Sequence, residues 1–231
     1  MKSGIVLWDI DGTLLRTPGV GIRCFTDAVQ SVTGREIVRQ PYDFGGKTDP
    51  LIALELLAPL GIDDPAVVDA VLAEVEANYT LLAAELRRTI VILPGVSDVL
   101  DACAARGVTQ TVVTGNIEPA ARHKISAGGL DAHLLLDCGG YGSDHHDRSA
   151  LVRLALARIA VEHAVDGAID PDHVWVVGDT PRDAACARDN GVHCLLVATG
   201  TYGLEELESQ GADHVLTDLA DVDRVVELLA G

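Results

Sequence analysis

The sequence lacks long apolar stretches: among its 231 residues, the longest uninterrupted apolar runs cover about five. A helix that crosses a bilayer needs roughly 20 such residues, so we expect no membrane span. The first four residues lead directly into a short apolar run and Asp9, a pattern that does not predict a signal peptide. The sequence therefore indicates neither a membrane partner nor secretion.

Basic residues are scarce. Seventeen Lys and Arg stand against 35 Asp and Glu, which gives a formal net charge of −18. Nucleic acids and anionic membranes are bound through basic surfaces, so we expect no nucleic-acid partner. Only three lysines occur, at Lys2, Lys47 and Lys124. An anion-binding site in this chain has few lysines to draw on.

Paired cysteine motifs are also missing, since no Cys-x-x-Cys occurs and the number of cysteines is odd. The five cysteines are Cys24, Cys103, Cys138, Cys186 and Cys194. Scattered thiols of this kind are typical of buried, reduced cysteines in a cytoplasmic protein. The 48% hydrophobic and 23% charged residues are ordinary globular values, and the length suits one or two domains.

Short apolar runs rich in β-branched residues are the strongest strand signals. They lie at Ile5–Trp8 and at residues 109–113, 134–136, 174–177, 194–197 and 214–216. Continuous apolarity predicts strands that are buried on both faces, as in a parallel sheet. Helical segments with capping residues, early prolines and terminal glycines alternate with these runs. The pattern predicts an α/β fold with a doubly wound, mostly parallel sheet, whose ligands bind at the carboxyl ends of the strands.

One region interrupts the alternation, because residues 16–88 contain no convincing strand. Asp49-Pro50 and Asp64-Pro65 each begin a helix there, and a further helix is expected near residues 22–32. We therefore predict a helical cap domain of residues 16–88, inserted into a core domain of residues 1–15 and 89–231.

Polar residues follow three of the predicted strands. Asp9 and Asp11 follow the first, and two carboxylates at this spacing can converge on a cation and a substrate, although Asp before Gly also favours a turn. Thr114 follows a second strand, where a hydroxyl suits an anion or a helix cap. Asp179 follows a third, whereas Asp183 occupies a capping-box position and has a structural explanation.

In this order, the motifs resemble those of the haloacid dehalogenase-like superfamily of phosphohydrolases, and the resemblance covers nearly the whole chain. The motifs are Asp9-Ile10-Asp11-Gly12-Thr13, Thr114-Gly115-Asn116 and Gly178-Asp179-Thr180-Pro181-Arg182-Asp183. The C-terminal segment around residues 200–203 and 211–215 looks like that of phosphoglycolate-phosphatase-like members. The resemblance implies a Rossmann-like core with an α-helical cap.

The resemblance also implies roles for the acidic residues. Asp9 would be the nucleophile that forms an aspartyl-phosphate, and Asp11 would protonate the leaving group and then activate water. Mg²⁺ would be held by the Asp9 carboxylate, the Asp11 backbone carbonyl and Asp179. Asp183 would position a metal-bound water or the phosphate-binding cation. A hard dication also makes physical sense here, because a phosphate dianion cannot otherwise approach several carboxylates.

For the phosphate, the resemblance implies Thr114 and the backbone amides of Gly115 and Asn116. The family usually adds a lysine after the third strand, and this sequence departs from that pattern. Arg148, at the start of the next helix, is our candidate, since arginine suits bidentate phosphate contacts. Lys124 is the alternative, although a solvated surface lysine is its ordinary interpretation.

Within the insert, Lys47 and Thr48 are candidates for contacting the substrate, because relatives with a cap place a loop of this type at the active site. A plain exposed position for Lys47 stays open. Asp49 is explained by capping of its own helix.

The sequence thus predicts a Mg²⁺-dependent phosphatase that hydrolyses a small phosphorylated metabolite. The alternatives are a phosphomutase, a phosphonatase or a dehalogenase of the same superfamily, or a non-catalytic regulatory module on the same fold. The presence of Asp11 argues against a dehalogenase. The presence of Asp9, Asp11 and Asp179 together argues against a module that has lost catalysis.

Overall fold

A computed structural model describes residues 4–37, 44–163 and 169–231. Six parallel strands form one sheet in the order β5-β4-β1-β6-β7-β8. They are β1 (Ile5–Trp8), β4 (Thr109–Thr114), β5 (Gly140–Tyr141), β6 (Val174–Gly178), β7 (His193–Val197) and β8 (His214–Leu216). The chain builds outward from the central β1 in both directions, which confirms the predicted doubly wound α/β fold. Such a sheet places its ligand site beside β1, where the strand order reverses.

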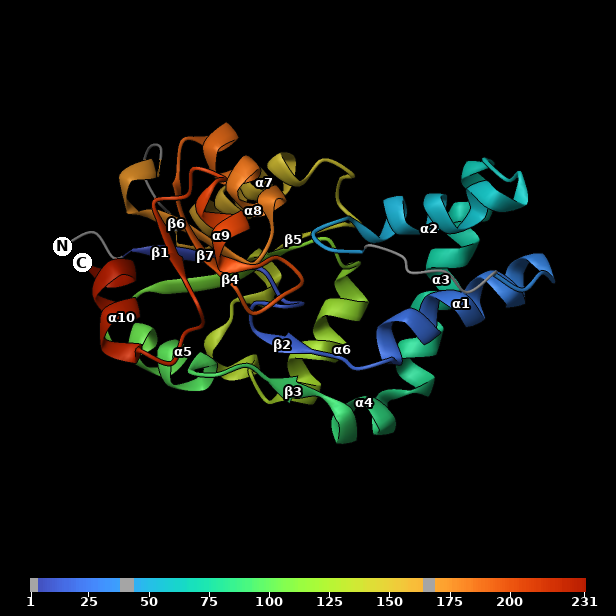
Figure 1. The fold of residues 1–231 in the computed structure, drawn as a ribbon, viewed down its shortest axis with the longest axis horizontal. Helices are drawn as coiled ribbons and strands as arrows, with labels where there is room; N and C mark the ends of the chain where they lie inside the picture. The colour runs from blue at the N-terminus through green and yellow to red at the C-terminus, as the bar shows by residue number, and fades with distance from the viewer. Residues whose placement is uncertain (1–3, 38–43, 164–168) are drawn as a thin grey trace.

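Helices cover both faces of the sheet (Figure 1). They are α5 (Val96–Ala105) and α10 (Val222–Ala230) on one face, and α7 (Arg148–Glu162) and α8 (Pro181–Asn190) on the other. The short α9 (Leu204–Glu208) connects β7 to β8 along the chain. Alternate β1 residues enter different hydrophobic clusters: Val6 and Trp8 pack with α5, whereas Ile5 and Leu7 pack with α7. Burial on both faces explains why these strands read as continuous apolar runs.

The strand predicted at residues 134–136 is absent. Two short 3₁₀ helices, η2 (Asp131–His133) and η3 (Leu136–Cys138), occupy this region, and the edge strand β5 follows them. Leu135 still bonds to β4, because its N–H donates to the Gln110 carbonyl at 2.8 Å and its carbonyl accepts from Thr111 Oγ1 at 2.6 Å. These two hydrogen bonds satisfy the backbone N–H and carbonyl of Leu135 without forming a strand.

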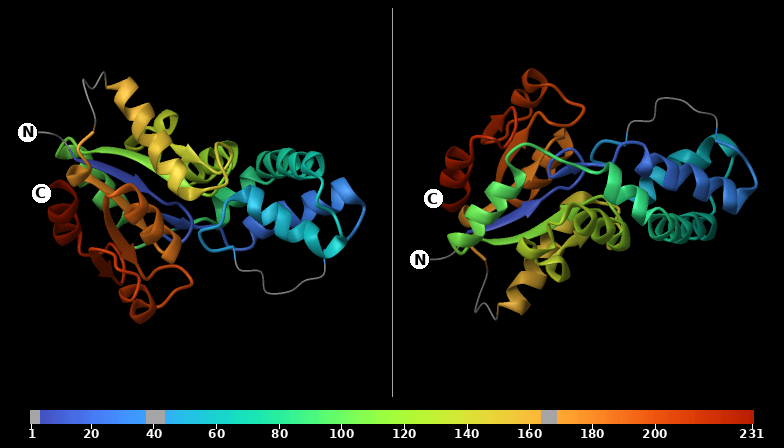
Figure 2. Two further views of the ribbon diagram at one scale, coloured as in Figure 1. Left: turned by 90° about the horizontal axis from the view of Figure 1, so that it is seen from above. Right: turned by 90° about the horizontal axis from the view of Figure 1, so that it is seen from below.

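Four helices gather at one end of the molecule, away from most of the sheet (Figures 1 and 2). They are α1 (Val20–Thr33), α2 (Asp49–Leu57), α3 (Pro65–Leu81) and α4 (Ala83–Thr89), with the 3₁₀ turn η1 (Ala58–Leu60) after α2. They share their own hydrophobic cluster, which also includes Ile117 and Ala120 from the start of α6 (Glu118–Gly128) and the turn before it. This separate cluster supports a helical cap, although the boundaries at residues 16 and 88 remain a prediction.

The chain enters and leaves this helical region through paired segments. β2 (Leu15–Arg16) and β3 (Val91–Ile92) run antiparallel and bond to each other. A two-stranded link therefore fixes where the helices are attached, close to the loop that follows β1.

All five cysteines are buried, and none forms a disulfide, as the sequence predicts. In the described part of the chain, no helix combines the length and apolarity required to cross a membrane.

Candidate active site

The loop after β1 folds back sharply and brings Asp9 and Asp11 to the end of the sheet. The N–H groups of Thr13 and Leu14 both bond to the Ile10 carbonyl, at 3.3 and 2.9 Å. Gly12 adopts a φ of +89°, and a Cβ there would lie 2.4 Å from Asp179 Oδ2. Glycine is therefore required twice, for the backbone conformation and for the close approach of Asp179.

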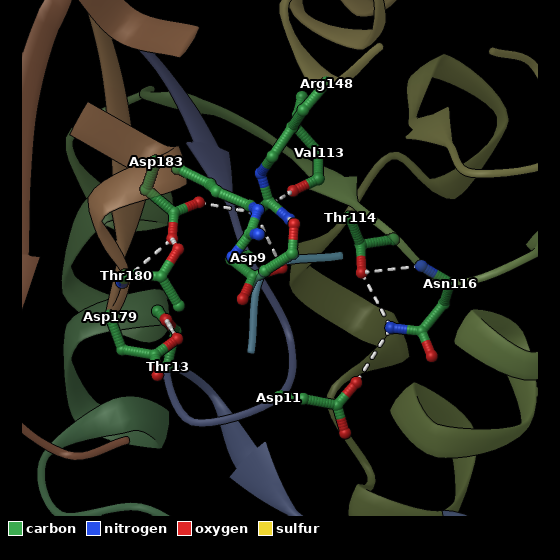
Figure 3. Close-up of polar contacts among 12 residues, drawn as sticks. Asp9, Asp11, Thr13, Val113, Thr114, Asn116, Arg148, Asp179, Thr180 and Asp183 are labelled. Carbon is green, nitrogen blue, oxygen red and sulfur yellow. Dashed lines mark hydrogen bonds and ion pairs between the residues drawn. The ribbon is translucent and has the colours of Figure 1, made fainter. Parts of the chain in front are cut away.

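Three carboxylates converge at this point (Figure 3). Asp9, Asp179 and Asp183 each offer an oxygen, and these atoms lie within 4.8 Å of one another. All three side chains are buried, and Thr13 Oγ1 donates to Asp179 Oδ1 at 3.2 Å. Burial, together with the neighbouring negative charges, raises the pKa values of Asp9 and Asp179 above their ordinary range. The cluster is short of positive charge.

Arg148, the first residue of α7, supplies the cation beside this cluster. Its Nη2 lies 2.9 Å from Asp9 Oδ1 and 2.5 Å from Asp183 Oδ1, and it donates to the Val113 carbonyl at 3.3 Å. Its buried Nε has no hydrogen-bond partner among the described residues. The structure thus pairs Arg148 with Asp183 and with Asp9.

Asp183 serves two purposes with its two oxygens. Oδ2 accepts hydrogen bonds from the Thr180 backbone N–H at 3.0 Å and from Thr180 Oγ1 at 2.6 Å, as a capping-box acid does. Oδ1 receives Arg148. The helix cap thus holds this carboxylate in position for the ion pair.

The Asp11 side chain points away from the acidic cluster and joins a second network. Its Oδ2 accepts from Asn116 Nδ2 at 2.8 Å and from Lys124 Nζ at 2.6 Å. Asn116 Nδ2 also donates to Thr114 Oγ1 at 2.7 Å. The Asp11 carboxylate is thus held by the loop after β4 and by α6.

Lys124 corrects one prediction. Its residue is 4% exposed rather than solvated, and Nζ also donates to Asn116 Oδ1 at 2.6 Å. Burial acts to lower its pKa, but the charge of Asp11 and the further contributions of Tyr79 and Asp49 outweigh burial and raise it. The signal in the sequence was helical spacing, because Ala120, Ala121 and Ile125 place position 124 on the buried side of α6.

Asp49 joins the helical region to the loop after β4. Its backbone N–H donates to the Gly115 carbonyl at 2.7 Å, and its Oδ2 accepts from the Ile117 N–H at 2.8 Å. The prediction that Asp49 caps its own helix is wrong. Thr48 is the N-cap residue, and the Asp49 carboxylate accepts the hydrogen bond from the Ile117 N–H instead. Burial raises the pKa of Asp49 to about 7, although Lys124 and the Ile117 N–H act to lower it.

The two substrate candidates of the insert lie in different places. Lys47 lines the cavity above the acidic cluster, is 12% exposed at its side chain, and pairs with Glu55 at 2.7 Å. Thr48 is buried beside a second, smaller cavity, with its Oγ1 3.5 Å from the His146 carbonyl. Substrate contacts by Lys47 and Thr48 remain predictions, and the geometry favours Lys47.

A cavity of about 640 Å³ opens between the end of the sheet and helices α1–α3. Its floor contains the predicted residues Asp9, Asp11, Thr114, Gly115, Asn116, Arg148 and Asp179. Its walls include Ile22, Phe25, Phe44 and Tyr79. The structure therefore brings together candidates of all three motifs in the lining of one cavity, and Asp183, which is not part of that lining, pairs with Arg148.

The chain is similar to known proteins in sequence and in fold. A family model described as haloacid dehalogenase-like hydrolase matches residues 6–188. The chain is 28% identical over 230 residues to the phosphoglycolate phosphatase of Rhodospirillum rubrum, covering 94% of this chain and 88% of that protein. It is 28% identical over 229 residues to the 5'-nucleotidase of Pseudomonas aeruginosa, covering 96% and 95%. The crystal structure of CbbY from Rhodobacter sphaeroides in complex with phosphate superposes with a TM-score of 0.70 at 22% identity, over 95% of this chain and 96% of that one.

Proposed function

The chain belongs to the haloacid dehalogenase-like hydrolase family, and from that premise we propose that it is a Mg²⁺-dependent phosphatase acting through an aspartyl-phosphate on Asp9. The observation that carries the proposal is the convergence of Asp9, Asp179 and Asp183 within 4.8 Å beside Arg148. A lone structural ion pair does not need three buried carboxylates on one arginine.

The chemistry of the donor set fits magnesium. The cluster offers hard oxygen ligands, which magnesium prefers, and it contains neither sulfur nor imidazole. Three buried carboxylates against one guanidinium leave negative charge that a dication would offset. Asp9, Asp179 and the Asp11 backbone carbonyl would hold the ion, with Asp183 nearby. When bound, Mg²⁺ screens these carboxylates from the phosphate dianion and stabilises charge on the transferring group.

Each residue of the site has a separate role in the two steps of phosphoryl transfer. Asp9 attacks phosphorus as the bond to the leaving oxygen breaks, and Asp11 gives a proton to that oxygen. Water then attacks the aspartyl-phosphate, the bond to Asp9 breaks, and Asp11 takes a proton from the water. Arg148, the Thr114 hydroxyl and the amides of Gly115 and Asn116 hold the phosphoryl oxygens. Catalysis in this scheme rests on positioning and charge stabilisation.

The proposed substrate is a small phosphate monoester. A cavity of about 640 Å³ accommodates a phosphoryl group at its floor and a modest organic group against Ile22, Phe25 and Phe44. Lys47 offers a charge at the cavity wall for a polar substituent. Two relatives carry names of enzymes that hydrolyse phosphate monoesters, phosphoglycolate phosphatase and 5'-nucleotidase. Both names imply a phosphate monoester as the substrate, which is the class that we propose for this chain.

The direct test is phosphate release from p-nitrophenyl phosphate, measured with Mg²⁺, with excess chelator, and with Zn²⁺ in place of Mg²⁺. We expect release with Mg²⁺ and its loss in chelator. Full activity in chelator, or restoration by Zn²⁺ but not Mg²⁺, contradicts the proposal. A panel of about a hundred phosphorylated metabolites, assayed in the same way, then identifies the substrate.

A further inference from the structure

Lys124 is a buried lysine that the steps above do not use. Its side chain is 5% exposed, and Nζ lies 2.6 Å from Asp11 Oδ2 and 2.6 Å from Asn116 Oδ1. The ring of Tyr79, from helix α3, lies over it, with its centroid 5.6 Å from Nζ. Burying a lysine is costly, so a buried lysine that is bonded to Asp11 calls for a specific role.

The network around Lys124 has one consistent arrangement. Lysine only donates, so the Asn116 atom facing Nζ is the amide oxygen, and the Asn116 amide nitrogen faces Asp11 and Thr114. The two donors Asn116 Nδ2 and Lys124 Nζ both fall on Asp11 Oδ2. Oδ1 is thus left as the oxygen that neither donor touches.

We propose that Lys124 is a positioning residue for Asp11, which it holds through Oδ2 so that Oδ1 exchanges the proton. The inference rests on the proposed function. In the first step, the proton moves from Oδ1 to the leaving oxygen as its bond to phosphorus breaks. In the second step, Oδ1 takes a proton from the attacking water. The Asp11 side chain is 41% exposed, so without Lys124 its carboxylate keeps the hydrogen bond from Asn116 but is held less firmly in this orientation.

The test compares two substrates that differ in their need for a proton. The leaving group of p-nitrophenyl phosphate departs without one, whereas that of phenyl phosphate depends on protonation. For Lys124→Met, we expect kcat/KM for phenyl phosphate to fall by about 10- to 100-fold, the scale of a misplaced catalytic group, and kcat/KM for p-nitrophenyl phosphate to fall by less than about threefold. Arg122→Met is the matched control, because Arg122 lies on the same helix and its ion pairs with Glu118 and Asp137 are exposed to solvent.

A double-mutant cycle with Asp11→Asn shows whether Lys124 acts through Asp11. If it does, Lys124→Met costs nothing further in the Asp11→Asn background. Lys124→Arg keeps the charge and is expected to retain more phenyl phosphate hydrolysis than Lys124→Met. If Lys124→Met fails to fold, Lys124→Arg is compared with wild type on both substrates and is expected to lose phenyl phosphate hydrolysis selectively.

Equal losses on both substrates, or losses that add in the cycle, overturn the inference and leave the proposed function standing. A wild-type chain that releases phosphate from neither ester in Mg²⁺ overturns the proposed function, and this inference with it.

Discussion

Replacing Arg148 by alanine removes the only cation that the described structure places in contact with the acidic cluster. Its Nη2 lies 2.9 Å from Asp9 and 2.5 Å from Asp183, and both carboxylates are buried. The variant leaves Asp9, Asp179 and Asp183 facing one another with no guanidinium between them. It also removes one of the donors that we assign to the transferring phosphoryl group.

The size of the effect follows from the burial of these groups. Breaking a buried ion pair from one side costs on the order of 3–5 kcal/mol of stability, because the remaining charge is left without a partner. A preorganised donor at a developing charge contributes on the order of 10²- to 10³-fold in rate. We therefore expect Arg148→Ala to lower kcat/KM by at least about 100-fold. Since arginine stays protonated, the contribution of Arg148 should not vary with pH.

The assay is p-nitrophenyl phosphate hydrolysis in Mg²⁺, with inorganic phosphate as a competitive inhibitor and urea unfolding as the measure of stability. Arg148→Ala is expected to weaken phosphate inhibition along with kcat/KM, and Arg148→Lys to recover part of both. Arg153→Ala is the control, because Arg153 lies on the same helix with its side chain 59% exposed, and its contacts with Asp147 and Asn190 are long, at 4.0 and 3.4 Å. A folded Arg148→Ala variant with near wild-type kcat/KM and phosphate inhibition would refute the assignment.

Two further predictions concern the helical region. The pKa of Asp49, about 7 when folded, exceeds its ordinary value of 3.8, so the folded state binds more protons and the free energy of unfolding falls as pH rises between these values. Asp49→Asn, which keeps an acceptor for the Ile117 N–H, should reduce this fall by on the order of 1–2 kcal/mol, measured by urea unfolding at about pH 5 and pH 8 in chelator; an unchanged fall would contradict it. Lys47→Met should raise KM for the metabolite found in the panel by about tenfold or more with little change in kcat, and an unchanged KM would remove Lys47 from the substrate contacts.

The strand ends and their acids are predictable because local signals determine them. Buried strands read as apolar runs, and the carboxyl ends of parallel strands meet at one edge of the sheet. Asp9 and Asp179 therefore come together in the structure as the sequence indicates. The capping-box position of Asp183 is equally local, and it coincides with the ion pair to Arg148.

The second network was not predictable, because it depends on contacts between segments far apart in the chain. Asp11 and Lys124 are separated by 113 positions, and Asp49 and Ile117 by 68. The residues near Lys124 in the sequence do not indicate that its partner is the Asp11 carboxylate. The strand predicted at residues 134–136 was wrong for a related reason. Leu135 forms one backbone and one side-chain hydrogen bond with β4, and these bonds form without a strand.

The central claim is that Asp9 is the nucleophile, and the most direct measurement is Mg²⁺-dependent phosphate release by Asp9→Asn against wild type. The amide is nearly isosteric with the carboxylate but is a poor nucleophile and a weaker magnesium ligand. We predict that the folded variant loses about 10⁴-fold or more of the rate, as nucleophile replacements typically do. A folded Asp9→Asn variant that retains more than about one per cent of the wild-type rate would contradict the mechanism.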